Sequence, residues 1–266
     1  MDNSKPTKRY ILLNIIGFIA TIVLNGLANA LPLNGKTTGE LSDAYPNLFV
    51  PAGFTFSIWG IIYLLLLIFI VYQISLLTKK KVDTANFIGK IGGWFFISSL
   101  ANASWIVAWH YEQVEISLLI MLVLLVSLIK IYRSLKIGVS NVPQKEKWMV
   151  HVPFSVYLGW ITIATIANTT ALLVDLGWDG FGIDQQYWAS IMIGAGIIIA
   201  LLMVVRRKDL FFNAVVFWAI YGIYAKRSNS DILPDSSVEA ISVIGMVIIG
   251  IAILALAGKR LIFRKV

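Results

Sequence analysis

The chain contains no cysteine and few charged residues. Its 266 residues include 22 Lys and Arg, 14 Asp and Glu and 2 His, so charged residues make up 14% and hydrophobic residues 58%. The absence of cysteine excludes disulfides, thiol catalysis and cysteine-ligated metals. A soluble protein carries about 25% charged residues. The shortage of charge therefore excludes a water-soluble enzyme, a nucleic-acid-binding domain and a disordered protein, even though the net charge is +8.

Eight apolar segments lack Lys, Arg, Asp and Glu altogether, and every charged residue lies between or beyond them. Such segments form helices in a bilayer, because an unpaired backbone group in hydrocarbon costs several kcal/mol. The sequence thus predicts an all-α fold, a polytopic transmembrane helix bundle with eight spans. The segments are residues 10–31, 52–77, 91–109, 116–129, 152–173, 188–205, 210–225 and 240–257.

Two of these segments, 116–129 and 210–225, are short for a span, which needs about 17–25 residues. The first reaches Leu135 if Lys130 extends its charge toward the interface. The second is expected to cross the membrane because strongly basic connections alternate with weakly basic or acidic ones along the whole chain, and this alternation requires a crossing at residues 210–225. Lys and Arg mark the cytoplasmic side. We therefore expect a cytoplasmic (inner) membrane protein with eight crossings and both termini in the cytoplasm.

The N-terminus also has an alternative interpretation. A basic tail, an apolar run and the sequence Ala28-Asn29-Ala30 together resemble a secretory signal with its cleavage site. The apolar run is longer than the 7–15 residues of a signal core, which favours a first membrane helix.

Nothing in the sequence is typical of catalysis. His110 and His151 lie at segment ends, without a carboxylate at a helical spacing that would orient either ring. Metalloprotease, phosphate-loop and catalytic-triad patterns are absent from the sequence. No ionisable group lies within a span, which disfavours proton-coupled transport. We expect no catalytic residues and no metal site, and a binding protein rather than an enzyme.

Aromatic side chains and two asparagines recur at helical spacing on three of the segments. Spacings of three and four residues place such side chains on one helix face. Trp and Asn facing lipid would lack hydrogen-bond partners, so these faces should point into the bundle. At 1.5 Å per residue they lie mainly in the outer half of the bilayer. They predict either a small-molecule pocket or simple helix packing. The faces comprise Phe56, Trp59 and Tyr63; Asn102, Trp105 and Trp109; and Tyr157, Trp160, Ala164 and Asn168.

Three motifs at these positions resemble those of the TspO/MBR family, the tryptophan-rich sensory proteins related to the mitochondrial translocator protein. Residues 51–63, PAGFTFSIWGIIY, resemble the family's PPGWxFGPVWTxLY. Residues 100–105, LANASW, resemble its LNxxW, and residues 157–168, YLGWITIATIAN, resemble its PYxxWxxFATYLN. The resemblance covers about residues 10–178.

The resemblance implies a five-helix core over residues 1–178, followed by a three-helix extension over residues 179–266. It implies a pocket for a porphyrin or haem, with no cofactor required, beneath a lid over residues 32–51. The family often forms dimers, so a homodimer in the lipid bilayer is a further expectation. The implied ligand-binding residues are Trp59, Tyr63, Asn102, Trp105, Tyr157, Trp160, Ala164 and Asn168.

The function expected is therefore the binding of a flat hydrophobic small molecule, for sensing or transport. Three alternatives remain at this point. The protein could be a facilitative transporter of a small solute. It could degrade porphyrin in light, with Trp59, Trp105 or Trp160 taking part in radical chemistry. It could also be a scaffold with no ligand.

Overall fold

The chain forms a bundle of long helices. The computed structural model describes residues 4–30, 33–81, 85–228 and 236–262, and these contain helices and no strands. The eight long helices among them are α1 (Ser4–Ala30), α3 (Ile58–Thr78), α5 (Trp94–His110), α6 (Val114–Ser134), α8 (Val152–Asp175), α9 (Gln185–Arg207), α10 (Leu210–Ser228) and α11 (Ser236–Ile262).

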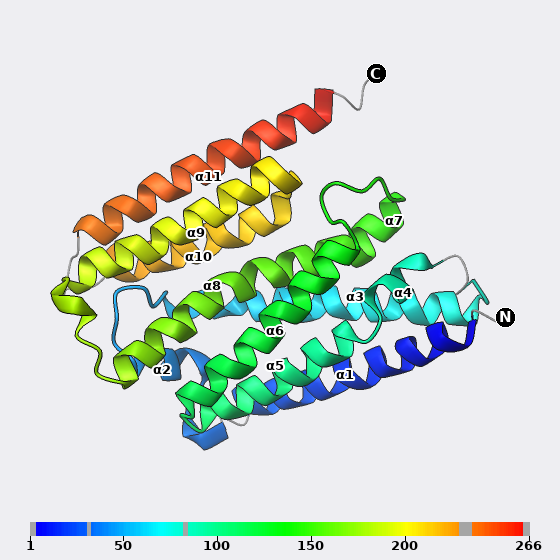
Figure 1. Ribbon diagram of the computed structural model, residues 1–266, viewed down its shortest axis with the longest axis horizontal. Coiled ribbons are helices and arrows are strands. Elements are labelled where there is room, and N and C mark those ends of the chain that lie inside the picture. The colour runs from blue at the N-terminus through cyan, green and yellow to red at the C-terminus, as the bar shows by residue number, and fades with distance from the viewer. Residues whose placement is uncertain (1–3, 31–32, 82–84, 229–235, 263–266) are drawn as a thin grey trace.

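Six of these helices, α1, α3, α6, α8, α9 and α11, are long and apolar enough to cross a membrane. The other two are α5, with 17 residues, and α10, with 19 residues. Helix α5 packs against α1 and α6, and α10 packs against α8, α9 and α11. Successive long helices run in opposite directions, and both ends of the chain lie at the same end of the bundle (Figure 1). The protein is an integral membrane protein with the polytopic helical fold that the sequence predicted.

Short helices lie at the two ends of the bundle. At the end away from both termini lie η1 (Leu33–Gly35), α2 (Thr38–Asp43), η2 (Gly53–Ser57) and η5 (Gly180–Gly182). We call this the lid end and residues 33–57 the lid segment; Pro32, the first residue of the predicted lid, lies outside the described residues. At the opposite end lie α4 (Asn86–Ile91), α7 (Gln144–Glu146) and the π-helical turn η4 (Lys147–His151).

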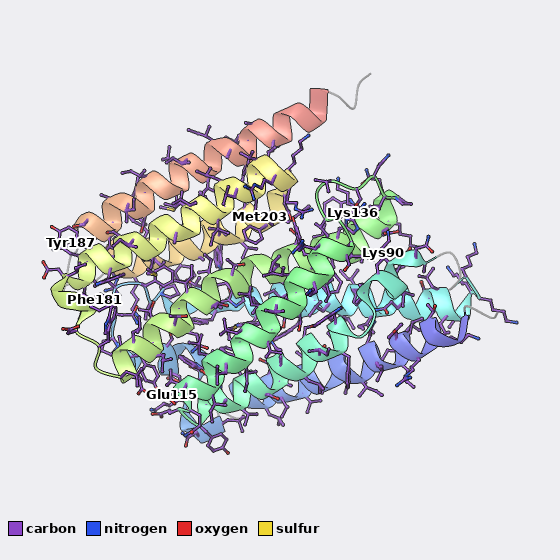
Figure 2. The ribbon with its side chains drawn as sticks, in the orientation of Figure 1. Lys90, Glu115, Lys136, Phe181, Tyr187 and Met203 are labelled. Atoms are coloured by element: carbon purple, nitrogen blue, oxygen red, sulfur yellow. The ribbon has the colours of Figure 1, made fainter. Side chains whose placement is uncertain are left out.

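The charges differ between the two ends, as the sequence indicated. Lys90 and Lys136 lie at the end that carries the termini, whereas Glu115 lies at the lid end (Figure 2). Helix α6 begins beside Glu115 and continues to Ser134, so it is longer than its uncharged segment. This length agrees with the prediction that the short fourth segment extends to about Leu135.

Asp209 is a buried charge that the sequence pattern did not single out. It lies in the α9–α10 connection and is only 3% exposed. Its carboxylate accepts hydrogen bonds from the hydroxyls of Tyr132, at 2.7 Å, and Ser155, at 2.6 Å. It also accepts from the backbone N–H groups of Phe211 and Phe212 at the start of α10. A carboxylate there satisfies unpaired N–H groups and complements the helix dipole. Asp209 therefore ties α6 and α8 to the beginning of α10.

Candidate functional site

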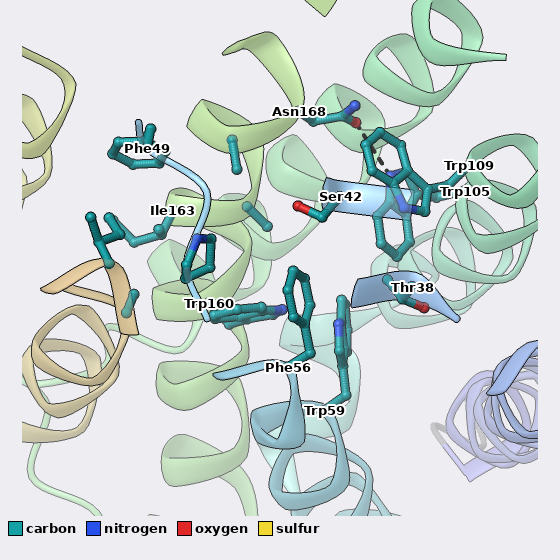
Figure 3. A pocket seen from close by; sticks show the side chains of 15 residues that line it. Thr38, Ser42, Phe49, Phe56, Trp59, Trp105, Trp109, Trp160, Ile163 and Asn168 are labelled. Atoms are coloured by element: carbon teal, nitrogen blue, oxygen red, sulfur yellow. Dashed lines mark hydrogen bonds between the residues drawn. The ribbon is translucent and has the colours of Figure 1, made fainter. Parts of the chain in front are cut away.

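A cavity near the lid end collects aromatic side chains from several helices. Its free volume is about 50 Å³, and none of its lining residues carries a charge. The rings of Trp160, Phe56 and Trp59 lie along one side, and those of Trp105 and Trp109 lie along another (Figure 3). The lining residues are Thr38, Ser42, Phe49, Pro51, Phe56, Trp59, Trp105, Trp109, Trp160, Ile163, Ala164, Ala167, Asn168, Ala219 and Ile223.

Five of the eight residues that the sequence suggested for ligand binding line this cavity: Trp59, Trp105, Trp160, Ala164 and Asn168. The three tryptophans come from α3, α5 and α8. The Trp59 ring centroid lies 5.7 Å from that of Trp105 and 6.1 Å from that of Trp160, the latter edge to face. These separations are typical of favourable aromatic pairs. The three helical faces therefore converge on one site.

The other three residues, Tyr63, Asn102 and Tyr157, are not among those that line the cavity. The Tyr63 ring stacks on Trp59 at a centroid distance of 5.6 Å. Asn102 is fully buried, and its Nδ2 donates to the Tyr157 hydroxyl at 2.9 Å. Its Oδ1 accepts from Asn25 Nδ2 at 2.7 Å. Asn102 therefore bridges α1, α5 and α8, which is the helix-packing role that the sequence left open.

Asn168 lines the cavity and also bridges helices. Its Oδ1 accepts from Trp105 Nε1 at 3.3 Å, the dashed line in Figure 3. Its Nδ2 donates to Ser117 Oγ on α6 at 3.0 Å. These bonds hold the Trp105 indole in a fixed orientation, so Asn168 shapes one wall of the cavity through its neighbour.

Two indole groups at the cavity have polar atoms without a protein partner. Nε1 of Trp109 and Nε1 of Trp160 are buried and have no hydrogen-bond acceptor among the described residues. Trp109 is 6% exposed and Trp160 is 3% exposed. A buried donor left unpaired costs about 1–3 kcal/mol. Both N–H groups are enclosed by neighbouring side chains, so an acceptor reaches them only where those side chains move.

The lid segment is attached to α5 on one side. Asn34 Nδ2 donates to the backbone oxygen of His110 at 3.0 Å. The Lys36 ammonium pairs with the Glu112 carboxylate at 2.8 Å, just beyond the end of α5. The Tyr45 ring of the lid segment lies 5.7 Å from the ring of Trp109, which lines the cavity. The lid segment therefore covers the α5 wall of the cavity.

The lid segment is attached to α10 on the other side. The Ala52 N–H donates to the backbone oxygen of Gly222 at 2.9 Å, and Trp218 Nε1 donates to the backbone oxygen of Thr55 at 3.0 Å. A Cβ at Gly222 would lie 2.0 Å from Thr55 Oγ1, so only glycine permits this approach. Asp43 of the lid segment pairs with Lys226 of α10.

Helix α10 contributes to the site more than the sequence suggested. Ala219 and Ile223 line the cavity, whereas the sequence placed every pocket residue within the first 178 residues. The sequence does carry one signal in α10, an aromatic face formed by Trp218, Tyr221 and Tyr224 at helical spacing. Trp218 and Tyr221 of that face pack against Phe54, at ring-centroid distances of 5.5 and 5.9 Å.

No group of His, Asp or Glu that could hold a metal ion occurs within the described part of the chain. The fold and the cavity define the class: a polytopic helical membrane protein with a tryptophan-lined cavity beneath a lid. Residues 11–256 match the family model described as TSPO-like protein, and the chain belongs to this family. The match continues through α9 and α10 into α11, beyond the region of the three motifs. Searches of curated proteins and of solved structures return no match.

Proposed function

We propose that the protein binds a flat hydrophobic molecule, a porphyrin- or haem-type tetrapyrrole, in the aromatic cavity for sensing or transport. The observation that carries this proposal is the pair of unpartnered indole N–H groups, on Trp109 and Trp160, at a cavity with aromatic walls. The rings supply apolar area for a planar ligand. The N–H groups supply donors for its carboxylate or carbonyl oxygens. This combination of an apolar lining with a few polar groups is typical of small-molecule sites.

The size of the cavity requires the lid segment to move. Its free volume of about 50 Å³ is well below the roughly 300–1,000 Å³ of most small-molecule sites. The Phe56 ring occupies space beside Trp160, at a centroid distance of 6.0 Å and nearly perpendicular to it. A tetrapyrrole therefore needs Phe56 and the adjoining lid residues to shift. In this proposal, the arrangement with Phe56 beside Trp160 is the closed one.

Titration with protoporphyrin IX tests the proposal in purified protein, with quenching of tryptophan fluorescence and the shift of the Soret band as independent readouts. Trp160→Phe removes the N–H group but keeps an aromatic ring in the wall. Loss of one hydrogen bond of about 1–1.5 kcal/mol should weaken binding about tenfold. Trp148→Phe is the matched control, because Trp148 is 55% exposed and lies in η4, away from the lid end.

Saturable binding to the wild type and to Trp148→Phe, weakened in Trp160→Phe, would support the proposal. Equal affinity in all three proteins would refute the role of the Trp160 N–H group. Absence of saturable binding to the wild type would refute the tetrapyrrole itself.

We also propose that both termini face the cytoplasm, in an inner membrane. The support is the Lys-rich end of the bundle, which carries both ends of the chain in Figure 1. Because the chain has no cysteine, a single introduced cysteine is a unique label. In intact cells, a membrane-impermeant thiol reagent should modify Glu115→Cys and leave Lys90→Cys unmodified. The reverse pattern would invert the proposed orientation.

A further inference from the structure

A second cavity lies at the lid end, between α8 and α9. Its volume is about 350 Å³, several times that of the aromatic cavity and within the range of small-molecule sites. Its walls come from residues 47–49 of the lid segment, the last turns of α8, the α8–α9 connection and the first turns of α9. Phe49 contributes to both cavities and is 2% exposed, so its ring forms part of the wall between them.

The α8–α9 connection is built to support the outer wall of this second cavity. Trp188 Nε1 donates to the backbone oxygen of Gly180 at 2.7 Å, which fixes the turn against α9. The Trp178 ring lies 5.0 Å from the Trp188 ring, centroid to centroid, and 5.2 Å from the ring of Phe181. Asp179 accepts from the Phe181 N–H at 3.0 Å. Both indoles that line the cavity are thus held by specific contacts.

The polar groups on the α8 wall already have partners within the helix. The hydroxyl of Thr169 donates to the backbone oxygen of Thr165 at 2.8 Å, and that of Thr170 donates to Ile166 at 2.9 Å. Leu173 and Met192 complete the facing α8 and α9 walls with apolar atoms. The α8 and α9 walls are thus mainly apolar, which favours contact with an apolar molecule, whereas Asn47, Asp179 and Gln185 supply polar groups elsewhere in the lining.

The charge at this cavity is negative. Asp179 is its only charged lining residue. The connection from Asp175 to Asp184 contains three Asp and no Lys or Arg. An anionic ligand would meet like charge at close range, which costs binding energy in a partly apolar site. A neutral or cationic molecule avoids this cost.

We propose that this second cavity is a binding site for a neutral or cationic aromatic molecule of about two fused rings, distinct from the aromatic cavity. A cavity of about 150 Å³ with apolar walls holds one benzene, so one of about twice that volume suits a naphthalene-sized molecule. The site prefers such a molecule to its anionic analogue because of Asp179. It does not depend on tetrapyrrole binding in the aromatic cavity.

Single cysteines in the otherwise cysteine-free chain provide the test. Met192→Cys places a thiol in the cavity wall, and Ile191→Cys, on the neighbouring residue that is 49% exposed, is the matched control. The rate of modification by methyl methanethiosulfonate is measured by mass spectrometry, with and without naphthalene. At about ten times its dissociation constant, naphthalene should slow modification of Met192→Cys about tenfold, since only the ligand-free protein reacts.

Naphthalene should leave the Ile191→Cys rate unchanged, and 1-naphthalenesulfonate should protect neither thiol. Equal protection of both thiols by naphthalene, or of neither, would overturn the site. Protection of Met192→Cys by the sulfonate as strong as that by naphthalene would overturn the charge preference. Thr170→Cys on the facing α8 wall repeats the measurement if Met192→Cys does not fold.

A cavity-filling change separates this proposal from the tetrapyrrole proposal. Ala189 lines the second cavity three residues before Met192, on the same face of α9. Ala189→Phe in the Met192→Cys protein should abolish protection by naphthalene and leave the protoporphyrin titration as in the wild type. Protection that persists in Ala189→Phe would contradict binding in this cavity, whatever the outcome of the protoporphyrin titration.

Discussion

The contact between Gly222 and Thr55 makes the lid segment sensitive to a single methyl group. Thr55 is fully buried, and a Cβ at position 222 would lie 2.0 Å from its Oγ1 and 2.7 Å from its Cγ2. Both distances are far below van der Waals contact, so Gly222→Ala must push η2 away from α10. The hydrogen bonds from Ala52 to Gly222 and from Trp218 to Thr55 then lengthen or break.

The cost of Gly222→Ala follows from these contacts. Overpacking of a tight interface costs about 1–3 kcal/mol, and each lost hydrogen bond costs about 0.5–1.5 kcal/mol. Alanine recovers at most about 1 kcal/mol of helix propensity relative to glycine. A net destabilisation of about 2–4 kcal/mol should lower Tm by about 5–15 °C for a chain of this size.

Thermal unfolding followed by circular dichroism, together with hydrogen exchange of residues 50–57, measures the effect of Gly222→Ala. Gly194→Ala is the control, because a Cβ there would meet no atom within 4 Å other than those of its own helix backbone and chain neighbours. Adding Thr55→Gly to Gly222→Ala removes the clashing side chain and should recover part of the lost stability. A Gly222→Ala protein with wild-type Tm and wild-type exchange would refute the close approach on which this reasoning rests.

Three further predictions concern polar groups. Asp209→Ala leaves several buried donors unpaired and should cost at least about 2 kcal/mol, seen as a lower Tm. Asn102→Ala should lower the free energy of unfolding by about 1–2 kcal/mol, seen as a lower Tm. It should leave protoporphyrin affinity within about twofold, since Asn102 bridges helices away from the cavity. Hydrogen bonds from the backbone and side chain of Thr37 lower the pKa of Glu40. That stabilisation of α2 is present at neutral pH and lost as acidification protonates Glu40 below about pH 4. Protection of residues 38–43 from hydrogen exchange, corrected for the intrinsic pH dependence of exchange, should therefore fall there in the wild type and vary less in Glu40→Gln.

The features that follow from local pattern were predictable from the sequence. Uninterrupted apolar segments predicted the helices, and alternating charge predicted that both ends of the chain lie at one end of the bundle, as Figure 1 shows. Helical spacing placed Trp59, Trp105 and Trp160 on inward faces, and the structure brings all three to one cavity. Each of these predictions depends only on residues close together in the sequence, for which periodicity is informative.

The features that were missed depend on contacts between distant residues. The sequence does not distinguish Asp209 from the other charged residues of the loops, because its partners Tyr132 and Ser155 lie 77 and 54 residues away. Tyr157 and Asn102 share inward faces with the cavity residues, yet they bond to each other across 55 residues and lie outside its lining. Spacing gives the face of a helix, whereas the depth at which two faces meet is set by packing.

Helix α10 lies in the part of the chain that the sequence assigned to a three-helix extension, and it takes part in the aromatic cavity. Helix α10 supplies Ala219 and Ile223 to the wall of the aromatic cavity. It also hydrogen-bonds to the lid segment twice, through the backbone oxygen of Gly222 and the indole N–H of Trp218. It therefore holds the lid segment over a cavity whose tryptophans all come from α3, α5 and α8. In the tetrapyrrole proposal, opening of the lid segment breaks contacts with α10 as well as with α5. The proposal therefore predicts that ligand affinity depends on residues beyond 178, because a ligand that opens the lid segment must offset the energy of the α10 contacts.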